Sequence, residues 1–123
     1  MRALIVDDSS TVRLVLATHL KKLGFDVTEA VNGQDGLARL REMEAADVVL
    51  VDWNMPEMDG ISFIQAVRAD HHYEALPLMM VTTNSEAEHV SKALEAGANE
   101  YLMKPFTRDI LVAKLSLLDV FGE

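Results

Sequence analysis

The sequence predicts an α/β fold in which a doubly wound parallel sheet of five strands carries five helices on its two faces. Five short apolar runs of β type occur along the chain, and a stretch with helical spacing follows each of them. This alternation is typical of a parallel sheet covered by helices on both sides. The motifs at the ends of the runs differ, so the chain is not a tandem repeat. The predicted strands begin near Ala3, Asp26, Val48, Leu78 and Glu100.

Composition narrows the class of protein. The 123 residues correspond to a single domain, and the lack of cysteine excludes disulfides, thiolate catalysis and cysteine-based metal sites. The net charge of −9 argues against direct nucleic-acid binding, which needs clustered Lys and Arg. No apolar run approaches the ~20 residues of a membrane span, and Asp7 interrupts the first run too early for a signal peptide. We therefore expect a cytoplasmic domain with no membrane or nucleic-acid partner.

The first two strand–helix units have clear boundaries. The run 3–6 lacks polar alternation, which predicts a strand buried on both faces. Ser10 is the expected N-cap of the first helix, and Gly24 is expected to end it with a positive φ. Residues 26–30 alternate as an edge strand does, and a turn at 32–33 leads into a weaker second helix. The apolar residues with helical spacing are Val12, Val15, Leu16, Leu20, Leu23, Leu37, Leu40 and Met43.

The middle of the chain contains the most strongly apolar strand. Residues 48–51 form this strand, and the segment 53–60 is a loop punctuated by Pro and Gly. A third helix is predicted over 61–69. Residues 71–77 are then expected to form a loop, and 78–81 the fourth strand.

The last third of the chain completes the pattern. The stretch from Ser85 to Glu88 has capping-box spacing and predicts a fourth helix that Gly97 ends. A short fifth strand follows at 101–103. Thr107 is the expected cap of the final helix. The side chains predicted to point inward from that helix are Ile110, Leu111, Leu115 and Leu118.

Polar residues follow the predicted strands where ligands bind in such sheets, beyond the carboxyl ends. These residues are Asp7, Asp8, Asp52, Thr82 and Lys104. One acid in such a place usually only begins a loop, but three on neighbouring strands indicate a site. Two carboxylates about 4 Å apart repel by about 4 kcal/mol at a dielectric of ~20, so the cluster either holds a proton or binds a hard cation. Oxygen donors without cysteine favour Mg²⁺ over zinc.

Formal charge indicates what the neutralised site accepts. Mg²⁺ and Lys104 together balance the three carboxylates, and a phosphoryl group then meets no net repulsion. Metal, ammonium and the Thr82 hydroxyl can surround its equatorial oxygens while Asp52 acts as the nucleophile and forms an acyl phosphate. The Lys104-Pro105 step at a strand end predicts a fixed turn that aims the ammonium, with a cis peptide bond as one form of that turn.

Four motifs carry a family resemblance, at residues 6–10, 51–60, 81–83 and 101–106. In this order and spacing they resemble the receiver domain of two-component response regulators across 1–123, and they are most similar to the single-domain chemotaxis response regulators. The resemblance implies a flavodoxin-like sheet in the order 2-1-3-4-5. It also implies a phosphorylation-activated switch that turns over no external substrate and slowly removes its own phosphoryl group.

The resemblance also assigns roles to individual residues. Asp52 is the implied phosphoacceptor, and the implied Mg²⁺ ligands are Asp8, Asp7 (partly through water), Asp52 itself and the main-chain carbonyl of Asn54. Thr82 and Lys104 are expected to contact the phosphoryl oxygens. Tyr101 corresponds to a switch aromatic that turns inward when the Thr82 hydroxyl moves toward phosphate.

The resemblance implies two kinds of partner. The phosphoryl donor is a sensor histidine kinase or phosphotransfer protein, which donates from a phosphohistidine. A downstream target protein meets the face formed by the fourth helix, the fifth strand and the fifth helix.

Some positions depart from the chemotaxis pattern. Thr83 stands where a smaller residue is common, which affects access to the phosphorylation site. Asn84 replaces a frequent acid, which affects the lifetime of the phosphoryl group. Glu86, Glu88 and His89 stand where motor-binding proteins carry basic residues, so binding to the flagellar switch is not carried over.

Three alternatives compete with this interpretation. A phosphatase of the haloacid dehalogenase type needs a second Asp two residues after its nucleophile, and Asn54 cannot act as that acid and base. A flavodoxin-like flavin carrier needs a phosphate cradle after its first strand, where Asp7 and Asp8 repel phosphate. A receiver domain cut from a longer regulator with an output domain stays open.

Overall fold

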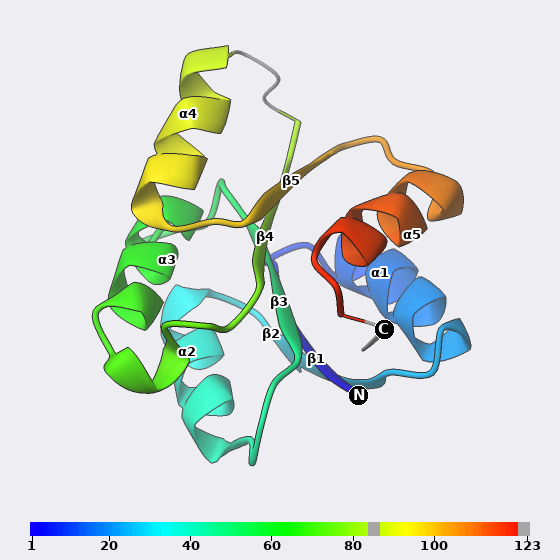
Figure 1. Cartoon of the computed structure of the whole chain (residues 1–123), viewed down its shortest axis with the longest axis horizontal. Coiled ribbons are helices and arrows are strands. Elements are labelled where there is room, and N and C mark those ends of the chain that lie inside the picture. Colours follow the sequence, from blue (N-terminus) through cyan, green and yellow to red (C-terminus); the bar gives the residue numbers. More distant parts are fainter. Residues whose placement is uncertain (84–86, 121–123) are drawn as a thin grey trace.

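The computed structural model describes residues 1–83 and 87–120, and five parallel strands form one sheet in the order β2-β1-β3-β4-β5 (Figure 1). The strands are β1 (Arg2–Val6), β2 (Asp26–Ala30), β3 (Val48–Asp52), β4 (Leu78–Thr82) and β5 (Glu100–Met103). The helices are α1 (Ser10–Lys22), α2 (Gly33–Glu42), α3 (Gly60–Arg68), α4 (Ala87–Ala96) and α5 (Arg108–Leu117), with a short 3₁₀ helix, η1 (His71–Tyr73). The predicted fold class and strand order are confirmed.

The sheet has a helical layer on each side. Figure 1 shows α1 and α5 against one face, and α2, α3 and α4 against the other. The core divides in the same way, because Leu4 and Val6 of β1 pack on the α2–α4 side whereas Ala3 and Ile5 pack on the α1–α5 side. Every residue of β3 and β4 is buried, as expected of central parallel strands. None of the helices in the described ranges is long and apolar enough to span a bilayer.

The strand order reverses between β1 and β3, and this reversal positions the site. β2 pairs with one edge of β1 and β3 pairs with the other. After β1 the chain leaves toward the α1 face, and after β3 it leaves toward the α3 face (Figure 1). The chain therefore leaves the neighbouring ends of β1 and β3 in opposite directions, and this is the place where open parallel sheets bind their ligands.

The helix caps confirm one prediction and correct two. Thr107 caps α5, accepting a bond from the Ile110 amide at 3.2 Å. Ser9, not Ser10, caps α1, because the Asp7 carboxylate holds the Ser9 amide at 2.8 Å and keeps that residue outside the helix. The expected turn at 32–33 is instead the start of α2, where the Asn32 side chain accepts from the Asp35 amide at 2.7 Å.

The remaining boundary predictions have mixed outcomes. Gly24 and Gly97 end α1 and α4 with φ of 97° and 122°, as predicted. The third helix begins at Gly60 rather than at residue 61, and the expected loop 71–77 contains η1. The predicted capping box at 85–88 includes residues outside the described part of the chain.

Two of the apolar helix residues that the sequence analysis assigned to a buried stripe are exposed instead. Ile110 was expected to point inward, but its side chain is 46% exposed, because the buried stripe of α5 follows Leu111 and Leu115, which are four residues apart. Val15 is also exposed, although its spacing fits the apolar stripe of α1.

Candidate functional site

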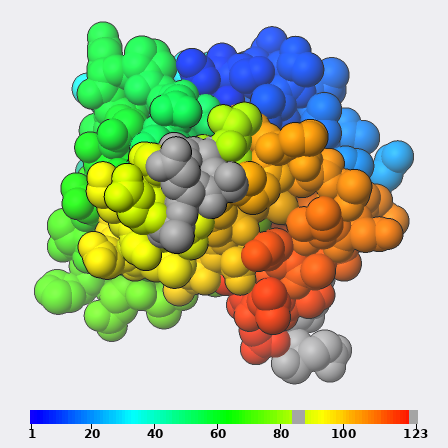
Figure 2. Space-filling model, turned by 90° about the horizontal axis from the view of Figure 1, so that it is seen from above, coloured from blue at the N-terminus to red at the C-terminus, as the bar shows by residue number. Residues whose placement is uncertain are grey.

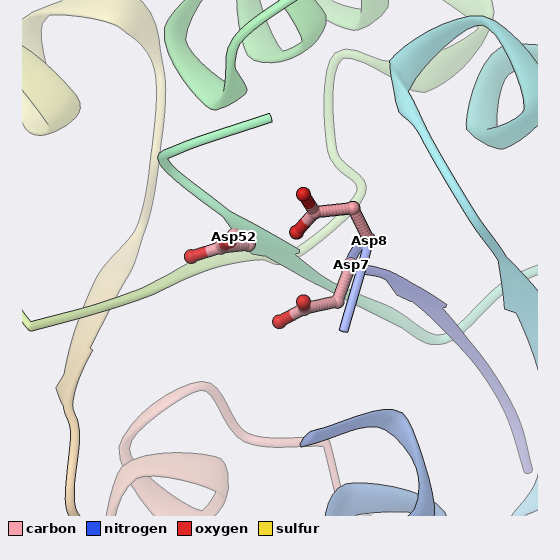
Figure 3. A group of neighbouring side chains, drawn as sticks. All are labelled: Asp7, Asp8 and Asp52. Carbon is pink, nitrogen blue, oxygen red and sulfur yellow. The ribbon is translucent and has the colours of Figure 1, made fainter. Parts of the chain in front are cut away.

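Three carboxylates meet beyond the ends of β1 and β3. Val6 lies opposite Val51 in the sheet, so the residues that follow them, Asp7 and Asp52, are neighbours. One carboxylate oxygen each from Asp7, Asp8 and Asp52 lies within 4.8 Å of the others, and Figure 3 shows the three side chains extending into the same space. Asp7 and Asp52 are 1% and 6% exposed, whereas Asp8 is exposed. The structure thus brings together the three acids that the sequence singled out.

Lys104 pairs with two of these acids. Its ammonium nitrogen lies 3.2 Å from Oδ1 of Asp52 and 3.4 Å from Oδ2 of Asp7. The residue follows β5, and its amide donates to the Thr82 carbonyl at 2.8 Å. The Lys104–Pro105 peptide bond is cis, one of the forms that the sequence allowed. One ammonium therefore faces two nearly buried carboxylates.

The charge of the cluster is not balanced by this lysine alone. Burial raises the pKa of Asp52 above its ordinary value, the charge of Asp7 raises it further, and Lys104 opposes both effects without cancelling them. The three acids all offer oxygen, the donor that hard divalent cations prefer. Buried oxygens that lack enough positive charge fit Mg²⁺, and the residues present are suited to hold it.

Thr82 and Tyr101 connect this site to the next strand. Thr82 ends β4 and is fully buried. The Tyr101 side chain on β5 is 6% exposed, and it shares a hydrogen bond with the side chain of Thr82. Burial raises the pKa of the Tyr101 hydroxyl above its ordinary value. The aromatic ring is therefore turned inward and linked to the hydroxyl at the end of β4.

Asp7 is held from several sides, by groups that the sequence analysis mostly overlooked. Its amide donates to the Ala30 carbonyl at 3.1 Å, and its carboxylate accepts from the Ser9 amide. Arg13 of α1 donates from Nη1 to the main-chain oxygen of Asp7 at 2.6 Å, and its Nε lies 3.2 Å from the Glu29 carboxylate. The only sequence signal for Arg13 was its place in the first turns of the helix that follows Asp7.

Comparison with known proteins agrees with this geometry. The family model described as the response regulator receiver domain matches residues 3–116. The chain is 45% identical over 123 residues to a chemotaxis protein CheY homolog of Campylobacter jejuni, covering 99% of this chain and 93% of that protein. It is 41% identical over 119 residues to chemotaxis protein CheY1 of Helicobacter pylori, covering 96% of each. A crystal structure of Vibrio cholerae CheY4 superposes with a TM-score of 0.90 at 33% identity, covering 95% of this chain and 97% of that one.

The chain belongs to the response regulator receiver family. Receiver domains of the CheY type are two-component signalling proteins rather than classical enzymes, and they generally bind Mg²⁺ at an acidic pocket. They interact with histidine kinases and with downstream targets. The predicted resemblance is confirmed, and the phosphatase and flavin-carrier alternatives are set aside.

The loop after β3 in this receiver is shaped by its backbone. The Met58 amide donates to the Pro56 carbonyl at 2.7 Å, which closes a γ-turn around Glu57, whose φ is 68°. A Cβ atom on Gly60 would collide with the main-chain oxygen of Asp52 and lie 2.9 Å from the Trp53 Cα. Helix α3 therefore starts directly against the backbone of the acid cluster, and only glycine fits at that point.

The remaining predicted site residues lie around this loop. Asn54 is exposed, two residues after Asp52, and the role of its main-chain carbonyl stays a prediction. Trp53 is partly buried, and its ring meets that of His89 on α4 edge to face, with centroids 5.2 Å apart. Thr83 and Glu88 are exposed. The predictions for Asn84 and Glu86 lie outside the described residues.

Proposed function

We propose that residues 1–123 form one receiver domain that acts as a phosphorylation-activated switch. Asp52 accepts a phosphoryl group from the phosphohistidine of a sensor histidine kinase or a phosphotransfer protein, with Mg²⁺ as cofactor. The observation that carries this proposal is the meeting of Asp7, Asp8 and Asp52 with the single ammonium of Lys104.

The transfer step is a substitution at phosphorus. A carboxylate oxygen of Asp52 forms a bond to phosphorus, the bond from phosphorus to the donor nitrogen breaks, and the electron pair stays on the imidazole. Asp7, Asp8, Asp52 and the main-chain carbonyl of Asn54 would hold Mg²⁺, which supplies positive charge to the phosphoryl oxygens. Lys104 lies 3.2 Å from Asp52, close enough to exchange that carboxylate for a phosphoryl oxygen.

The signal passes from the site through Thr82. Its hydroxyl is the group that a phosphoryl on Asp52 would attract, and its side chain is already bonded to that of Tyr101. A shift of Thr82 therefore changes the hydrogen bonding of an aromatic residue on β5. In the proposed switch, the inward position of the ring, which this structure already adopts, is the one that a shift of Thr82 toward the phosphoryl group favours.

The response is read at the output face, which we define as α4, β5 and α5. Both helices contact β5, and Figure 2 shows α4 (yellow) and α5 (orange to red) on one surface with the β5 region between them. Leu94 and Ile110 expose apolar side chains on the two helices. We propose that a downstream target protein binds this face with an affinity that depends on phosphorylation. The protein slowly removes its own phosphoryl group, and a receiver taken from a longer regulator would work in the same way.

Acetyl phosphate tests the chemistry without a partner protein. With Mg²⁺, intact mass spectrometry should detect one added phosphoryl group on the wild type and none on Asp52→Asn. Asp26→Asn, which removes an exposed acid at the start of edge strand β2, should be modified like the wild type. Equal modification of Asp52→Asn, or of the wild type in excess EDTA, would contradict the proposal.

A further inference from the structure

We infer that Arg13 is a positioning residue for the metal-binding acids, acting through the peptide that joins Asp7 to Asp8. The inference rests on the proposed function, because it assigns Arg13 a part in Mg²⁺ binding at the proposed phosphorylation site. Arg13 itself touches neither the carboxylates that would hold the ion nor the reacting oxygen of Asp52.

The contact is short and well supported. Nη1 of Arg13 lies 2.6 Å from the main-chain oxygen of Asp7, a length typical of strong charge-assisted hydrogen bonds. The Arg13 side chain is largely buried, and its Nε is engaged by Glu29 near the carboxyl end of β2. The guanidinium therefore uses two donors of its fixed fork at once, one on β2 and one on the backbone at the site.

Asp8 is the ligand that depends most on this contact. In residues 1–83 and 87–120 we find no hydrogen bond or ion pair to its carboxylate, whereas Asp7 is held by both Ser9 and Lys104. The peptide bond is planar, so a fixed Asp7 oxygen also fixes the direction in which the chain enters Asp8. Arg13 thereby orients an exposed carboxylate that has no side-chain partner in the part of the chain that the structure describes.

An electrostatic role and a positioning role of Arg13 predict opposite changes in Mg²⁺ affinity when the residue is replaced. If the guanidinium acted only as a nearby positive charge, its removal would strengthen Mg²⁺ binding. That effect is small here, since Glu29 already neutralises Arg13 and the pair is partly solvated. If Arg13 acts by position, its removal weakens binding, and the loss of groups that orient metal ligands typically lowers metal affinity 10–100-fold.

Titration of the metal-free protein with Mg²⁺ tests the inference. Trp53 fluorescence reports binding beside Asp52, and the rise of the melting temperature with Mg²⁺ gives an independent affinity. Arg13→Met, which keeps the apolar stem, should weaken Mg²⁺ binding about ten-fold or more. Arg13→Lys should weaken it to a similar degree, because one ammonium cannot replace the two-donor fork. Glu29→Gln should change the affinity by less than about three-fold, and Arg41→Met, the same change at an exposed position of α2, should leave it unaltered.

The outcomes separate this inference from the proposed function. If Arg13→Met folds and binds Mg²⁺ within about two-fold of the wild type, Arg13 is only a tie between α1 and β2, and the inference is wrong. Wild-type affinity in Arg13→Lys would also overturn it, and this variant decides the matter if Arg13→Met does not fold. A wild type that responds to Mg²⁺ in neither readout would overturn both the inference and the proposed metal site. If the wild type responds and every variant matches it, the inference fails while the proposed function stands.

Discussion

The Asp52 carboxylate occupies a place where its charged form is unfavourable. It is nearly buried beside Asp7, and its pKa lies above the ordinary value of 3.8. The folded protein therefore binds this proton more tightly than the unfolded chain does. By linkage, stability that is present below pH 3.8 is lost as the pH rises through the raised pKa. The charged carboxylate of Asp52, the proposed nucleophile, thus destabilises the metal-free protein at neutral pH.

Asp52→Asn should stabilise the metal-free protein. At pH 7 in EDTA we expect a gain of about 1 kcal/mol, or roughly 4 °C in melting temperature, because the amide carries no charge to bury. Calorimetry from pH 3 to pH 8 should find the two proteins nearly equal at the acid end, with a gap that grows as pH rises and then levels off. Asp26→Asn should follow the wild type, and a gap of the same size at every pH would refute the explanation.

Tyr101→Phe tests the bond between the site and β5. Removal of the hydroxyl leaves the buried Thr82 side chain without that hydrogen bond, and we expect a loss of about 1 kcal/mol in the free energy of unfolding. Urea denaturation measures it, with Tyr73→Phe as a control on a partly buried tyrosine outside the site. A loss no larger than the control's would mean that this bond does not contribute to the fold.

For single residues, the sequence predicted the charged groups of the site but not the residues that hold them in position. Asp7, Asp52 and Lys104 could be placed together because the carboxyl ends of parallel strands share one edge of the sheet. Arg13 and Glu29 could not, since their contacts depend on how the first turns of α1 lie over the end of β2. Such packing is set by tertiary structure and leaves no spacing rule in the chain.

Among the elements, the β3–α3 loop constrains the site most directly. Its γ-turn and the tight start of α3 both follow Asp52 within a few residues, and the Gly60 amide donates to the Trp53 carbonyl at 2.9 Å. The loop therefore places the start of α3 against the main chain that carries Asp52. A disturbance at this element should reach the metal site.

Gly60→Ala should damage both stability and metal binding. The added methyl meets the backbone of Asp52 and Trp53, which cannot move as a flexible side chain would, so we expect a loss of about 1–3 kcal/mol. Mg²⁺ affinity, followed by Trp53 fluorescence, should fall as well. Gly24→Ala is the matched control, because it strains a positive φ in open space just beyond the C-terminal end of α1 and should lower stability alone. Unchanged Mg²⁺ binding in Gly60→Ala would show that the β3–α3 loop does not determine the geometry of the metal site.

Helix and strand boundaries were predicted mostly to within one residue, because caps and glycines act locally. Thr107 and both positive-φ glycines were identified from residue type. The prediction of Ser10 rather than Ser9 as the N-cap of α1 was wrong. The position of the cap depends on the hydrogen bond from the Ser9 amide to the Asp7 carboxylate, which helix propensities do not describe. Ile110 was wrong for a related reason, because spacing alone does not say where the edge of a buried stripe falls.

For the whole molecule, alternation of strands and helices predicted the layers but not the strand order. The order 2-1-3-4-5 came from the family resemblance, since alternation alone fits several arrangements of the same units. That order brings β1 beside β3 and places β4 and β5 on the far side of Asp52. A change at the acid cluster can therefore reach the output face through two adjacent strands.

The most direct test of the account compares amide chemical shifts of the protein with Mg²⁺ alone and with Mg²⁺ plus beryllium fluoride, which mimics the phosphoryl group on Asp52. We predict that beryllium fluoride changes the amide chemical shifts of Thr82 and Tyr101 and those along α4 and α5, while the chemical shifts of β2 change little. Shifts confined to the loops that carry Asp7, Asp8 and Asp52, with the output face unaltered, would contradict the claim that occupation of this site controls that face.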